Sequence, residues 1–453
     1  YTLGCKVNLY DTESMINLFR ERGYEIVDSN LPADIFIVNT CSVTNASDKK
    51  SRQLIRRAIA RNPDAFVIVC GCYARLNPDK VSQMPGVRLV LGLKDRSRIV
   101  DMIEGFLLGK NNSYLSSDET HDKRKAYYDP FLKEEGNVFA EKRTRAYVKI
   151  QDGCDNYCSY CVIPFARGPA RSRLPVDIMA EIQNLARAGY KEIVLTGIHA
   201  ASYGKDLTDT KPEDLIRQAH DIEGIERIRL SSVEPRLITQ PFMETLTHLS
   251  KFCDHFHLSL QSGCDDTLRR MNRKYTTEQY MRAVELIRSI YPRVGLTTDM
   301  IAGFPGETNK EFEESFHFAQ QIGFMKVHVF PYSKKDLTAA GRMQDQIEEK
   351  IKTERAARLI QLSDSMGQKF LNSFIGDKLS ILFEKKTDDH IFEGHSTNYI
   401  KVKVESFEDL RNTIKTVEIV SISDRCARGN LIQALSTDIN LGSCIKCPNY
   451  LEF

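Results

Sequence analysis

Three cysteines within eight residues constrain this 453-residue chain more than any other feature. Cys154, Cys158 and Cys161 have the spacing Cys-x3-Cys-x2-Cys and offer three thiolates at one place. A cluster of four irons and four sulfides is normally ligated by four cysteines, so three leave one iron open, as in catalytic metal sites. A zinc site would need a fourth Cys or His nearby, whereas the nearest histidines are His121 and His199. The pattern therefore indicates a catalytic iron–sulfur cluster.

The composition excludes several classes of protein. With 42% hydrophobic and 27% charged residues, it is typical of an ordinary soluble protein. No apolar run approaches the roughly 18 residues of a membrane span, and no signal peptide is visible, although the chain begins at Tyr1. Twelve irregularly spaced cysteines do not resemble a small secreted disulfide scaffold. We therefore expect a cytoplasmic protein that does not bind a membrane.

The first 108 residues alternate short apolar runs with helical patterns. Continuous apolar runs between helices predict parallel strands that are buried on both faces. We therefore expect residues 1–108 to form a small doubly wound α/β domain, followed by a polar linker or surface loop over 109–140. The expected strands cover 34–38 and 65–70, and the expected helices cover 11–22 and 46–61.

Residues 141–372 repeat a strand-then-helix pattern six times. This order predicts an incomplete (β/α)6 barrel of the TIM type, followed by a long amphipathic helix over 345–373. The expected strands cover 146–150, 192–196, 227–231, 255–260, 295–301 and 326–330, and the expected helices cover 175–189, 212–221, 239–251, 277–290 and 309–323.

From residue 373 to 440 the pattern changes to short strands separated by polar turns, which predicts a small antiparallel β-barrel. The tail, 441–453, contains Cys444 and Cys447. Their Cys-x2-Cys spacing is typical of metal or redox sites, but no second pair lies nearby, and we assign them no role. The expected strands cover 378–383, 391–395, 400–404, 416–422 and 431–434.

A second set of cysteines is dispersed in the sequence but has one shared context. Cys41 and Cys72 each follow an expected strand, and Cys5 follows what looks like the end of a first strand. Ligands in open α/β sheets gather at the carboxyl ends of strands, so these three cysteines would converge on one edge and could hold a second cluster. Three unrelated buried cysteines remain an equally valid interpretation of the spacing alone.

Together these residues resemble the methylthiotransferase family of radical S-adenosylmethionine (SAM) enzymes. In that family an N-terminal domain carries a three-cysteine auxiliary cluster, a central barrel binds SAM at its open iron, and a TRAM β-barrel follows. The triplet at 154–161 carries the resemblance first. The other matching stretches are Thr-Leu-Gly-Cys-Lys-Val-Asn at 2–8, Asn-Thr-Cys-Ser at 39–42, Gly-Cys-Tyr-Ala at 71–74, Pro-Phe-Ala-Arg-Gly at 164–168, Leu-Thr-Gly-Ile at 195–198, Leu-Ser-Leu-Gln-Ser-Gly at 258–263 and Gly-Phe-Pro-Gly-Glu at 303–307.

The resemblance implies two [4Fe–4S] clusters and two uses of SAM. One SAM methylates a sulfur at the auxiliary cluster, and a second yields a 5′-deoxyadenosyl radical that removes hydrogen from carbon 2 of an adenine before the methylthio group is inserted. The form Gly-Cys-Lys-Val-Asn at 4–8 resembles the branch that acts on N6-threonylcarbamoyladenosine, 3′ of the tRNA anticodon. We therefore expect tRNA as a partner, flavodoxin or ferredoxin as an electron donor, and a monomer.

The family also implies SAM contacts at the carboxyl ends of the barrel strands. An aromatic residue before the third cysteine lies against the adenine, and residues after the second and third strands contact the amino group and the ribose. The usual Gly-Gly-Glu form is absent here, and each residue would equally suit packing or a loop cap. The six candidates are Tyr160, Thr196, Gly197, Glu234, Gln261 and Gly303.

Contact with RNA needs positive charge near the two cysteine sets. One basic run follows Cys41 on an expected helix, another follows Cys161, and a third lies near the fifth strand–helix unit. A basic run is often only a solvated face. The candidates for RNA contact are Arg52, Arg56, Arg167, Arg171, Arg273 and Lys274.

Two other functions stay open at this point. The same chemistry could act on isopentenyladenosine in tRNA or on a protein aspartate. Alternatively, the chain could be a non-catalytic iron–sulfur protein that binds RNA. Iron content and cleavage of SAM distinguish an enzyme from a binding protein, and the modified product distinguishes the substrates.

Overall fold

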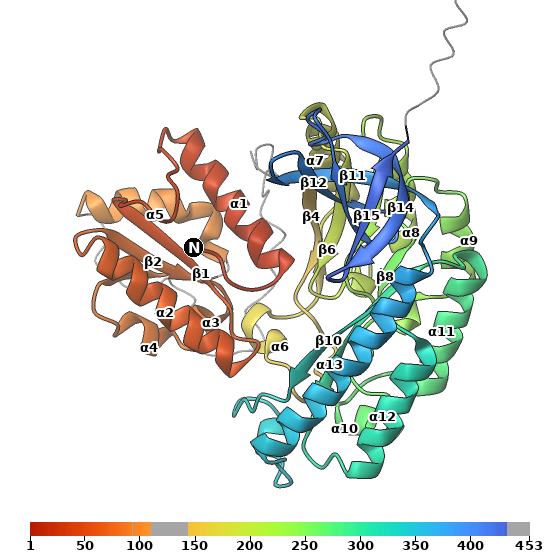
Figure 1. The fold of residues 1–453 in the computed structure, drawn as a ribbon. Coiled ribbons are helices and arrows are strands. Elements are labelled where there is room, and N and C mark those ends of the chain that lie inside the picture. Colours follow the sequence, from red (N-terminus) through yellow and green to blue (C-terminus); the bar gives the residue numbers. More distant parts are fainter. Residues whose placement is uncertain (93, 110–143, 433–453) are drawn as a thin grey trace, which may run out of the picture.

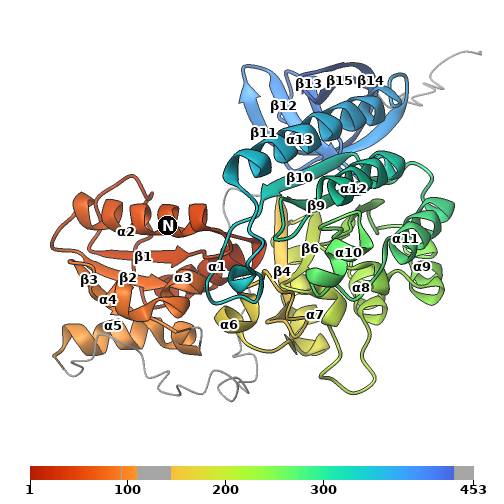
Figure 2. The same ribbon diagram turned by 90° about the horizontal axis from the view of Figure 1, so that it is seen from below.

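The structure is a computed structural model, and it describes residues 1–92, 94–109 and 144–432. The predicted tail and most of the predicted linker, including Cys444 and Cys447, lie outside the described residues. Three parts follow one another along the chain: a layered α/β part, a central barrel and a small C-terminal barrel (Figure 1). Figure 2 shows the first and last parts on different sides of the central barrel.

The N-terminal part is a three-stranded parallel sheet covered on both faces, as predicted. Along β2 (Phe66–Cys70) every residue is buried, and its side chains alternate between two separate apolar cores. One core contains α2 (Asn45–Arg61), and the other contains α1 (Lys6–Glu21) and α5 (Ile99–Leu107). The remaining elements are β1 (Ile35–Thr40), α3 (Gly71–Leu76), α4 (Pro78–Ser82), β3 (Val87–Val90) and the short helix η1 (Lys94–Arg98).

The central part contains the six expected parallel strands. They form two sheets, β4-β6-β7 and β8-β9-β10, which isolated bridges join at Ile228–Phe252 and Val233–Leu258. No pairing joins β4 to β10 within the described residues, so the predicted incomplete barrel is confirmed. The strands are β4 (Arg145–Asp152), β6 (Glu192–Gly197), β7 (Arg227–Leu230), β8 (His255–His257), β9 (Gly295–Ala302) and β10 (Lys326–Pro331), with the short β5 (Arg171–Ser172) antiparallel to β4.

Helices cover the outer side of this barrel and begin at capping threonines where the sequence provides them. The side chains of Thr276 and Thr308 accept hydrogen bonds from the third residue of the following helix, which satisfies a free backbone N–H. The helices are α6 (Ile163–Arg167), α7 (Pro175–Arg187), α8 (Pro212–His220), α9 (Gln240–Thr247), α10 (Asp265–Arg270), α11 (Thr277–Ile290), α12 (Asn309–Ile322), α13 (Glu349–Asn372) and the short η2 (Ala200–Ser202), η3 (Pro235–Leu237) and η4 (Ala340–Arg342).

The C-terminal part is the small barrel that was predicted, closed and five-stranded, with the order β11-β12-β13-β15-β14. Its strand pairs are antiparallel as predicted, except that β13 and β15 are parallel. The prediction of its last strand over 431–434 is wrong, because the strand covers Cys426–Leu431. Gly429 and Asn430 are poor strand formers and concealed it, although Gly429 lets the backbone of Glu418 approach closely. The strands are β11 (Lys378–Asp388), β12 (Ile391–Ser396), β13 (Lys401–Glu405), β14 (Ile414–Ser423) and β15 (Cys426–Leu431).

The small barrel packs against the amino ends of the central strands. The guanidinium of Arg227 donates a hydrogen bond to the carbonyl oxygen of His395 at 2.9 Å, and that of Arg229 donates to Thr397 at 2.9 Å. The ring of Tyr399 lies 5.1 Å from the guanidinium of Arg145 and 4.7 Å from that of Arg229. This contact leaves the carboxyl ends of the strands free of the small barrel. No helix among the described residues is long and apolar enough to cross a membrane.

Candidate functional site

The structure brings the three dispersed cysteines to one edge of the N-terminal sheet. Thr2 forms a parallel bridge with Asn39, and Thr40 forms one with Gly71, so three chain segments lie side by side where they end. Cys5 precedes α1, Cys41 directly follows β1, and Cys72 lies in the first turn of α3. The convergence follows from parallel strands sharing one carboxyl edge.

Asn8 and Gly4 hold two of these cysteine loops together. The side-chain amide of Asn8 donates to the carbonyl oxygens of Leu3 at 2.7 Å and Thr40 at 3.0 Å. Gly4 has φ +122°, and a Cβ there would lie 3.1 Å from the Cβ of Cys41. A side chain at residue 4 would therefore strain the backbone and crowd Cys41.

The chemistry of this set suits an iron–sulfur cluster. Burial raises the pKa of Cys72 to about 11 and raises that of Cys41, and the charge of Cys5 raises the pKa of both further. Such thiols need a metal to exist as thiolates at neutral pH. Within the described residues, no three His, Cys, Asp or Glu side chains could hold a single metal ion. A four-iron cluster places each of its thiolates on a separate iron, so it does not require three side chains around one ion.

The barrel triplet occupies one loop directly after β4. The N–H of Cys154 donates to the carbonyl oxygen of Gly168 at 3.0 Å, which closes the loop. The backbone N–H of Ile163 donates to the sulfur of Cys161 at 3.4 Å, and the guanidinium of Arg273 donates to the sulfur of Cys158 at 3.3 Å. Burial raises the pKa of Cys154 to about 11 and that of Cys161 to about 12. These donors stabilise charged sulfur, so this loop also fits a cluster.

Glu234 is surrounded by donors at the carboxyl end of β7. Its carboxylate lies 2.9 Å from the amide nitrogen of Asn156, 3.2 Å from Nε2 of His199, 2.8 Å from Arg236 and 3.0 Å from Arg273. The pKa of Glu234 is lowered to about 2, because the hydrogen bond from His199 and the charge of Arg273 outweigh its burial. The carboxylate therefore ties the cysteine loop to two neighbouring strands. Sequence reasoning missed His199 in this role, since its only signal was its place after a strand.

The other five candidates for SAM contact also lie at the carboxyl ends of strands. Tyr160 precedes Cys161 and lies 6.4 Å from the ring of Phe304, measured between centroids. Gln261 has φ +67° and forms a bridge with Met300 on β9, so its backbone is fixed. Gly303 has φ +72°, and a Cβ there would lie 2.5 Å from a carbon of Lys352. Thr196 and Gly197 end β6, with Thr196 buried.

The candidates for RNA contact separate into exposed and buried groups. Arg56 and Lys274 are exposed, and Arg52 is half-buried beside the hydroxyl of Tyr73 at 3.3 Å. The prediction that Arg167 contacts RNA is wrong, because its side chain is wholly buried. The basic run that follows Cys161 was expected to be exposed. Its first arginine, Arg167, is instead buried at the boundary between the N-terminal part and the barrel.

Two further candidates for RNA contact have side chains that are mostly buried and bind other residues of the protein. The side chain of Arg273 is 7% exposed and faces Cys158 and Glu234, so it belongs to the cysteine loop. Arg171 is 17% exposed and binds Asp152 at 3.2 Å. Neither guanidinium is free for a phosphate in this arrangement.

Arg167 belongs to a buried network of charges between the N-terminal part and the barrel. Its guanidinium contacts Asp152 at 2.8 Å and Asp11 of α1 at 2.9 Å. Asp11 also binds Lys149 of β4 at 2.6 Å and pairs with Arg96. The surrounding cations hold the pKa of both aspartates well below their usual range against the effect of burial. A buried pair of this kind requires a fixed arrangement of its partners.

The same arginine connects the two cysteine sets. Arg167 ends α6, which begins two residues after Cys161, and α6 packs against α3, which carries Cys72. The charge of Arg167 is the largest influence that opposes the burial of the Cys72 thiol. The Nε atom of Arg167 is buried and has no hydrogen-bond partner. The two sets thus lie across one boundary, with a cation between them.

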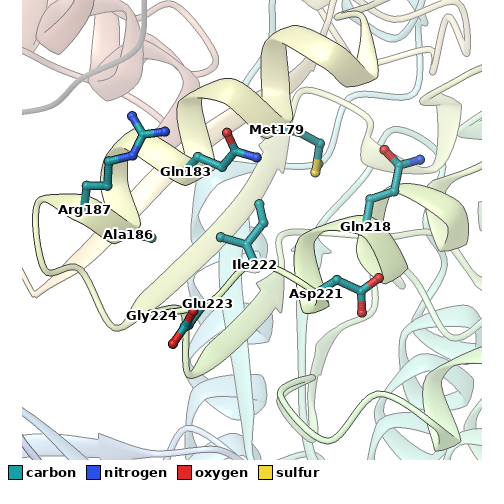
Figure 3. A pocket seen from close by; sticks show the side chains of 9 residues that line it. All are labelled: Met179, Gln183, Ala186, Arg187, Gln218, Asp221, Ile222, Glu223 and Gly224. Atoms are coloured by element: carbon teal, nitrogen blue, oxygen red, sulfur yellow. The ribbon is translucent and has the colours of Figure 1, made fainter.

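A hollow of about 560 Å³ lies elsewhere, on the outer side of the barrel (Figure 3). It lies between α7 and the end of α8 with the turn that follows, at the amino ends of the strands. None of the predicted cysteine or SAM residues lines it, so it is separate from the candidate site. Its lining consists of Met179, Gln183, Ala186, Arg187, Gln218, Asp221, Ile222, Glu223 and Gly224.

An incomplete parallel barrel with a three-cysteine loop after its first strand is the arrangement of radical SAM enzymes. A family model described as Radical SAM superfamily matches residues 148–319, and one described as Uncharacterized protein family UPF0004 matches residues 1–92. Among solved structures, the radical SAM methyltransferase TsrM from Kitasatospora setae is similar in fold, with a TM-score of 0.55 at 14% identity over 73% of this chain and 72% of that one.

Relatives that match nearly the whole chain show to which family of radical SAM enzymes it belongs. The threonylcarbamoyladenosine tRNA methylthiotransferase MtaB of Bacillus subtilis is 40% identical over 97% of each chain. The tRNA-2-methylthio-N(6)-dimethylallyladenosine synthase of Protochlamydia amoebophila is 33% identical over 95% of each chain. This chain therefore belongs to the radical SAM methylthiotransferase family. It is a transferase that uses SAM and [4Fe–4S] clusters, as predicted.

Proposed function

We propose that this protein transfers a methylthio group to carbon 2 of N6-threonylcarbamoyladenosine, 3′ of the anticodon in tRNA. The observation that carries the proposal is the contact of α6, which begins two residues after Cys161 and ends at Arg167, with α3, which carries Cys72. Insertion of a methylthio group needs a sulfur source beside the centre that activates the C–H bond. The similarity to MtaB of Bacillus subtilis along the whole chain supports the nucleoside.

Each cysteine set has its own role in this proposal. Cys154, Cys158 and Cys161 hold the cluster that binds SAM, and Cys5, Cys41 and Cys72 hold the auxiliary cluster. When bound, the two clusters and SAM supply the radical that removes hydrogen and the sulfur that replaces it. The protein orients them. Candidates for SAM contact at the strand ends are Tyr160, Thr196, Gly197, Glu234, Gln261 and Gly303.

For Glu234, contact with the SAM ribose would require one of its present partners to give way. Its carboxylate already binds Asn156 and lies near His199, Arg236 and Arg273. A carboxylate has about four lone-pair sites, so a ribose hydroxyl would compete for one of them. We therefore assign Glu234 first to positioning the cysteine loop and second to the ribose.

The proposed reaction requires two partners, a tRNA substrate and an electron donor. Exposed cations on α2 and after α10, represented by Arg56 and Lys274, are the remaining candidates for contact with the tRNA backbone. Reduction of the SAM-binding cluster needs a one-electron donor such as flavodoxin or ferredoxin. Since tRNA and these donors occur in the cytoplasm, we place the protein there and expect it to act as a monomer.

Product analysis tests the proposal directly. Protein reconstituted anaerobically with iron and sulfide is incubated with SAM, dithionite and an anticodon stem-loop that carries threonylcarbamoyladenosine. We expect about eight irons per chain, formation of 5′-deoxyadenosine and the methylthio nucleoside in the mass spectrum.

A parallel reaction uses a stem-loop that carries dimethylallyladenosine, because a relative named for that nucleoside is 33% identical. Product only on this second RNA would replace the proposed substrate with the second one. Intact SAM under reductant would instead indicate a protein that binds RNA without catalysis.

A further inference from the structure

One loop joins the surroundings of the two cysteine sets by a route that does not involve Arg167. It covers residues 332–348, between β10 and α13, and includes the short helix η4. We call it the bridging loop. Figure 2 shows it, in teal, between the N-terminal part and the central barrel. It contains no cysteine and no candidate for SAM contact, so its sequence alone gives no sign of a role.

On the barrel side, the bridging loop binds the loop that carries the cysteine triplet. The backbone N–H of Ala340 donates a hydrogen bond to the carbonyl oxygen of Ser159, within the triplet, at 2.7 Å. The ring of Tyr332 lies 5.5 Å from the ring of Phe304, which lies 6.4 Å from the ring of Tyr160. A backbone hydrogen bond and a row of edge-to-face rings thus fix the bridging loop against the triplet.

On the N-terminal side, the bridging loop binds the segment that follows Cys41. The ammonium of Lys335 lies 2.6 Å from one carboxylate oxygen of Asp48, which belongs to α2. The other oxygen accepts a hydrogen bond at 2.7 Å from the hydroxyl of Ser42, the residue after Cys41. The side chains of Lys335 and Asp48 are only 9% and 18% exposed. Because attraction between charges is stronger away from water, this pair fixes the Cys41 segment more firmly than a surface pair would.

Asn45 makes two more hydrogen bonds to the bridging loop. Its backbone N–H donates to the hydroxyl of Ser333 at 2.9 Å, and its side-chain amide donates to the carbonyl oxygen of Lys334 at 3.1 Å. Asn45 begins α2, so the start of this helix is held at two positions, by Asn45 and by Asp48. Two attachments set the direction of the helix as well as its distance.

The two ends of the bridging loop are themselves tied together. The hydroxyl of Thr338 donates to the carbonyl oxygen of Lys335 at 2.7 Å and accepts from the N–H of Gly341 at 3.1 Å. A Cβ on Gly341 would lie 2.0 Å from that same carbonyl oxygen, so the backbone there is closely packed. Lys335, which binds Asp48, is therefore joined over a short path to Ala340, which binds the triplet.

The bridging loop and Arg167 hold the N-terminal part at opposite faces of its sheet. Arg167 binds Asp11 of α1, whereas Lys335 binds Asp48 of α2. These two helices pack into separate apolar cores, one on each face of the sheet. Two domains that meet at one contact can still rotate about it, whereas contacts at both faces oppose that rotation. The Lys335 contact therefore restricts a motion that Arg167 alone would leave open.

We propose that Lys335 is a positioning residue, which acts through Asp48 to hold the N-terminal cysteine set at a fixed place relative to the triplet. The inference rests on the proposed function, in which a sulfur held at one set must reach a carbon activated at the other. A displacement of about 1 Å can slow such a step about a hundredfold. Without the pair, SAM would still be cleaved to 5′-deoxyadenosine, but fewer of these events would end in transfer of the methylthio group.

The coupling of these two products tests the inference. Each reconstituted variant is incubated with SAM, dithionite and the anticodon stem-loop, and the methylthio nucleoside formed per 5′-deoxyadenosine is measured. The variants are Lys335→Met, Lys335→Arg and the exchange that combines Lys335→Asp with Asp48→Lys. Lys334→Met is the matched control, because Lys334 is exposed, lies one residue away and binds Asn45 through its backbone.

We expect Lys335→Met to lower this ratio by about ten- to a hundredfold, with the iron content and the rate of 5′-deoxyadenosine formation unchanged. Lys335→Arg should keep most of the ratio, because it keeps the charge. The exchange should recover part of the loss, because it restores the pair in reverse. Lys334→Met should change nothing. A lysine that served only stability would lower both products together.

The magnetic interaction between the two reduced clusters gives a readout that does not depend on turnover. This interaction falls steeply with distance and changes with orientation. Electron paramagnetic resonance of the reduced proteins should therefore show an altered interaction in Lys335→Met and the wild-type interaction in Lys334→Met.

Two outcomes would overturn the inference. One is a Lys335→Met variant with an unchanged ratio and an unchanged magnetic interaction, because the pair would then be an ordinary contact between domains. The other is an equal loss of both products, or of iron, that the exchange does not restore. Failure of the proposed function is distinguishable, because the wild-type protein itself then adds no methylthio group to threonylcarbamoyladenosine. The same variants are in that case compared on the dimethylallyladenosine RNA and by their magnetic interaction.

Discussion

The two cysteine sets offer similar ligands, but the fold brings their cysteines together in different ways. Cys154, Cys158 and Cys161 come from one loop, whereas the N-terminal set comes from three strand ends that the parallel sheet brings together. The first set keeps its spacing whatever the rest of the chain does. The second exists only once β1 and β2 have paired. A local motif therefore identifies the superfamily, and the topology of a second domain supplies the partner site.

The surroundings of the two sets differ as well. Beside the barrel loop, the carboxylate of Glu234 and the guanidinium of Arg273 are paired at 3.0 Å. Beside the N-terminal set, the cation is Arg167, whose acidic partners are Asp11 of α1 and Asp152 of β4. The barrel loop is thus balanced locally, while the N-terminal set depends on a residue from the other domain.

The largest expected effect separates the two sets by product. Cys158→Ser should abolish cleavage of SAM, because the open iron is lost. Cys72→Ser should keep 5′-deoxyadenosine formation but abolish the methylthio product, because only the sulfur site is lost. Each variant should retain about four irons per chain, since one cluster remains. Iron assay and chromatography of both products measure these outcomes.

Cys426→Ser is the matched control, because Cys426 is buried in the small barrel, away from both sets. It should keep about eight irons and both products. If Cys72→Ser lost both products together while keeping its remaining iron, the assignment of separate roles to the two sets would be wrong.

The next effect concerns the cation between the sets. Arg167→Met leaves two buried aspartates with one partner fewer, which should lower the free energy of unfolding by about 3–5 kcal/mol. Arg358→Met removes an exposed pair with Glu313 and should cost less than about 1 kcal/mol. Urea unfolding of the two variants measures the difference. Equal midpoints would show that the boundary does not depend on this network.

Some helices and strands could be predicted from the sequence and others could not, and the reasons are physical. The helix over 277–290 and most barrel strands were predicted closely, because a threonine cap and buried apolar runs are local signals. The strand predicted over 255–260 is shorter and ends at His257. The helix expected to begin at residue 11 begins at Lys6 instead, since it starts where Cys5 leaves the sheet edge. β3 was missed because four residues with an exposed arginine resemble a loop.

The candidate site likewise contains residues that could be predicted from the sequence and residues that could not. Both cysteine sets could be proposed from spacing and from their places after strands. The roles of Arg167 and Arg273 could not, because a basic residue near a cysteine has the same sequence signal whether it faces solvent or sulfur. Arg167 is fully buried and the side chain of Arg273 is 7% exposed, and only tertiary packing decides this.

A pH dependence should mark the barrel loop. The pKa of Glu234 falls from 4.5 to about 2 on folding, so its contribution to stability is complete above about pH 4.5 and is lost as the pH falls through 2. The shift corresponds to about 3 kcal/mol. Urea unfolding of cluster-free protein between pH 2 and 5 should show this loss, and Glu234→Gln should reduce it while the part due to Asp11 and Asp152 remains. Glu313→Gln, at an exposed site, should leave the profile unchanged.

The smallest effect tests whether the two clusters are tuned separately. Arg273→Lys keeps a positive charge but removes the fork that donates to the sulfur of Cys158 at 3.3 Å and pairs with Glu234. A hydrogen bond to sulfur stabilises the reduced cluster, so its loss should lower the reduction potential of the SAM-binding cluster. Redox titration followed by electron paramagnetic resonance should show this shift in one signal, with the auxiliary signal unchanged. Lys274→Met, one residue further along and exposed, should shift neither. A shift of both signals in Arg273→Lys would mean that the clusters share one electrostatic environment, and the contrast between a locally balanced loop and an interdomain set would fail.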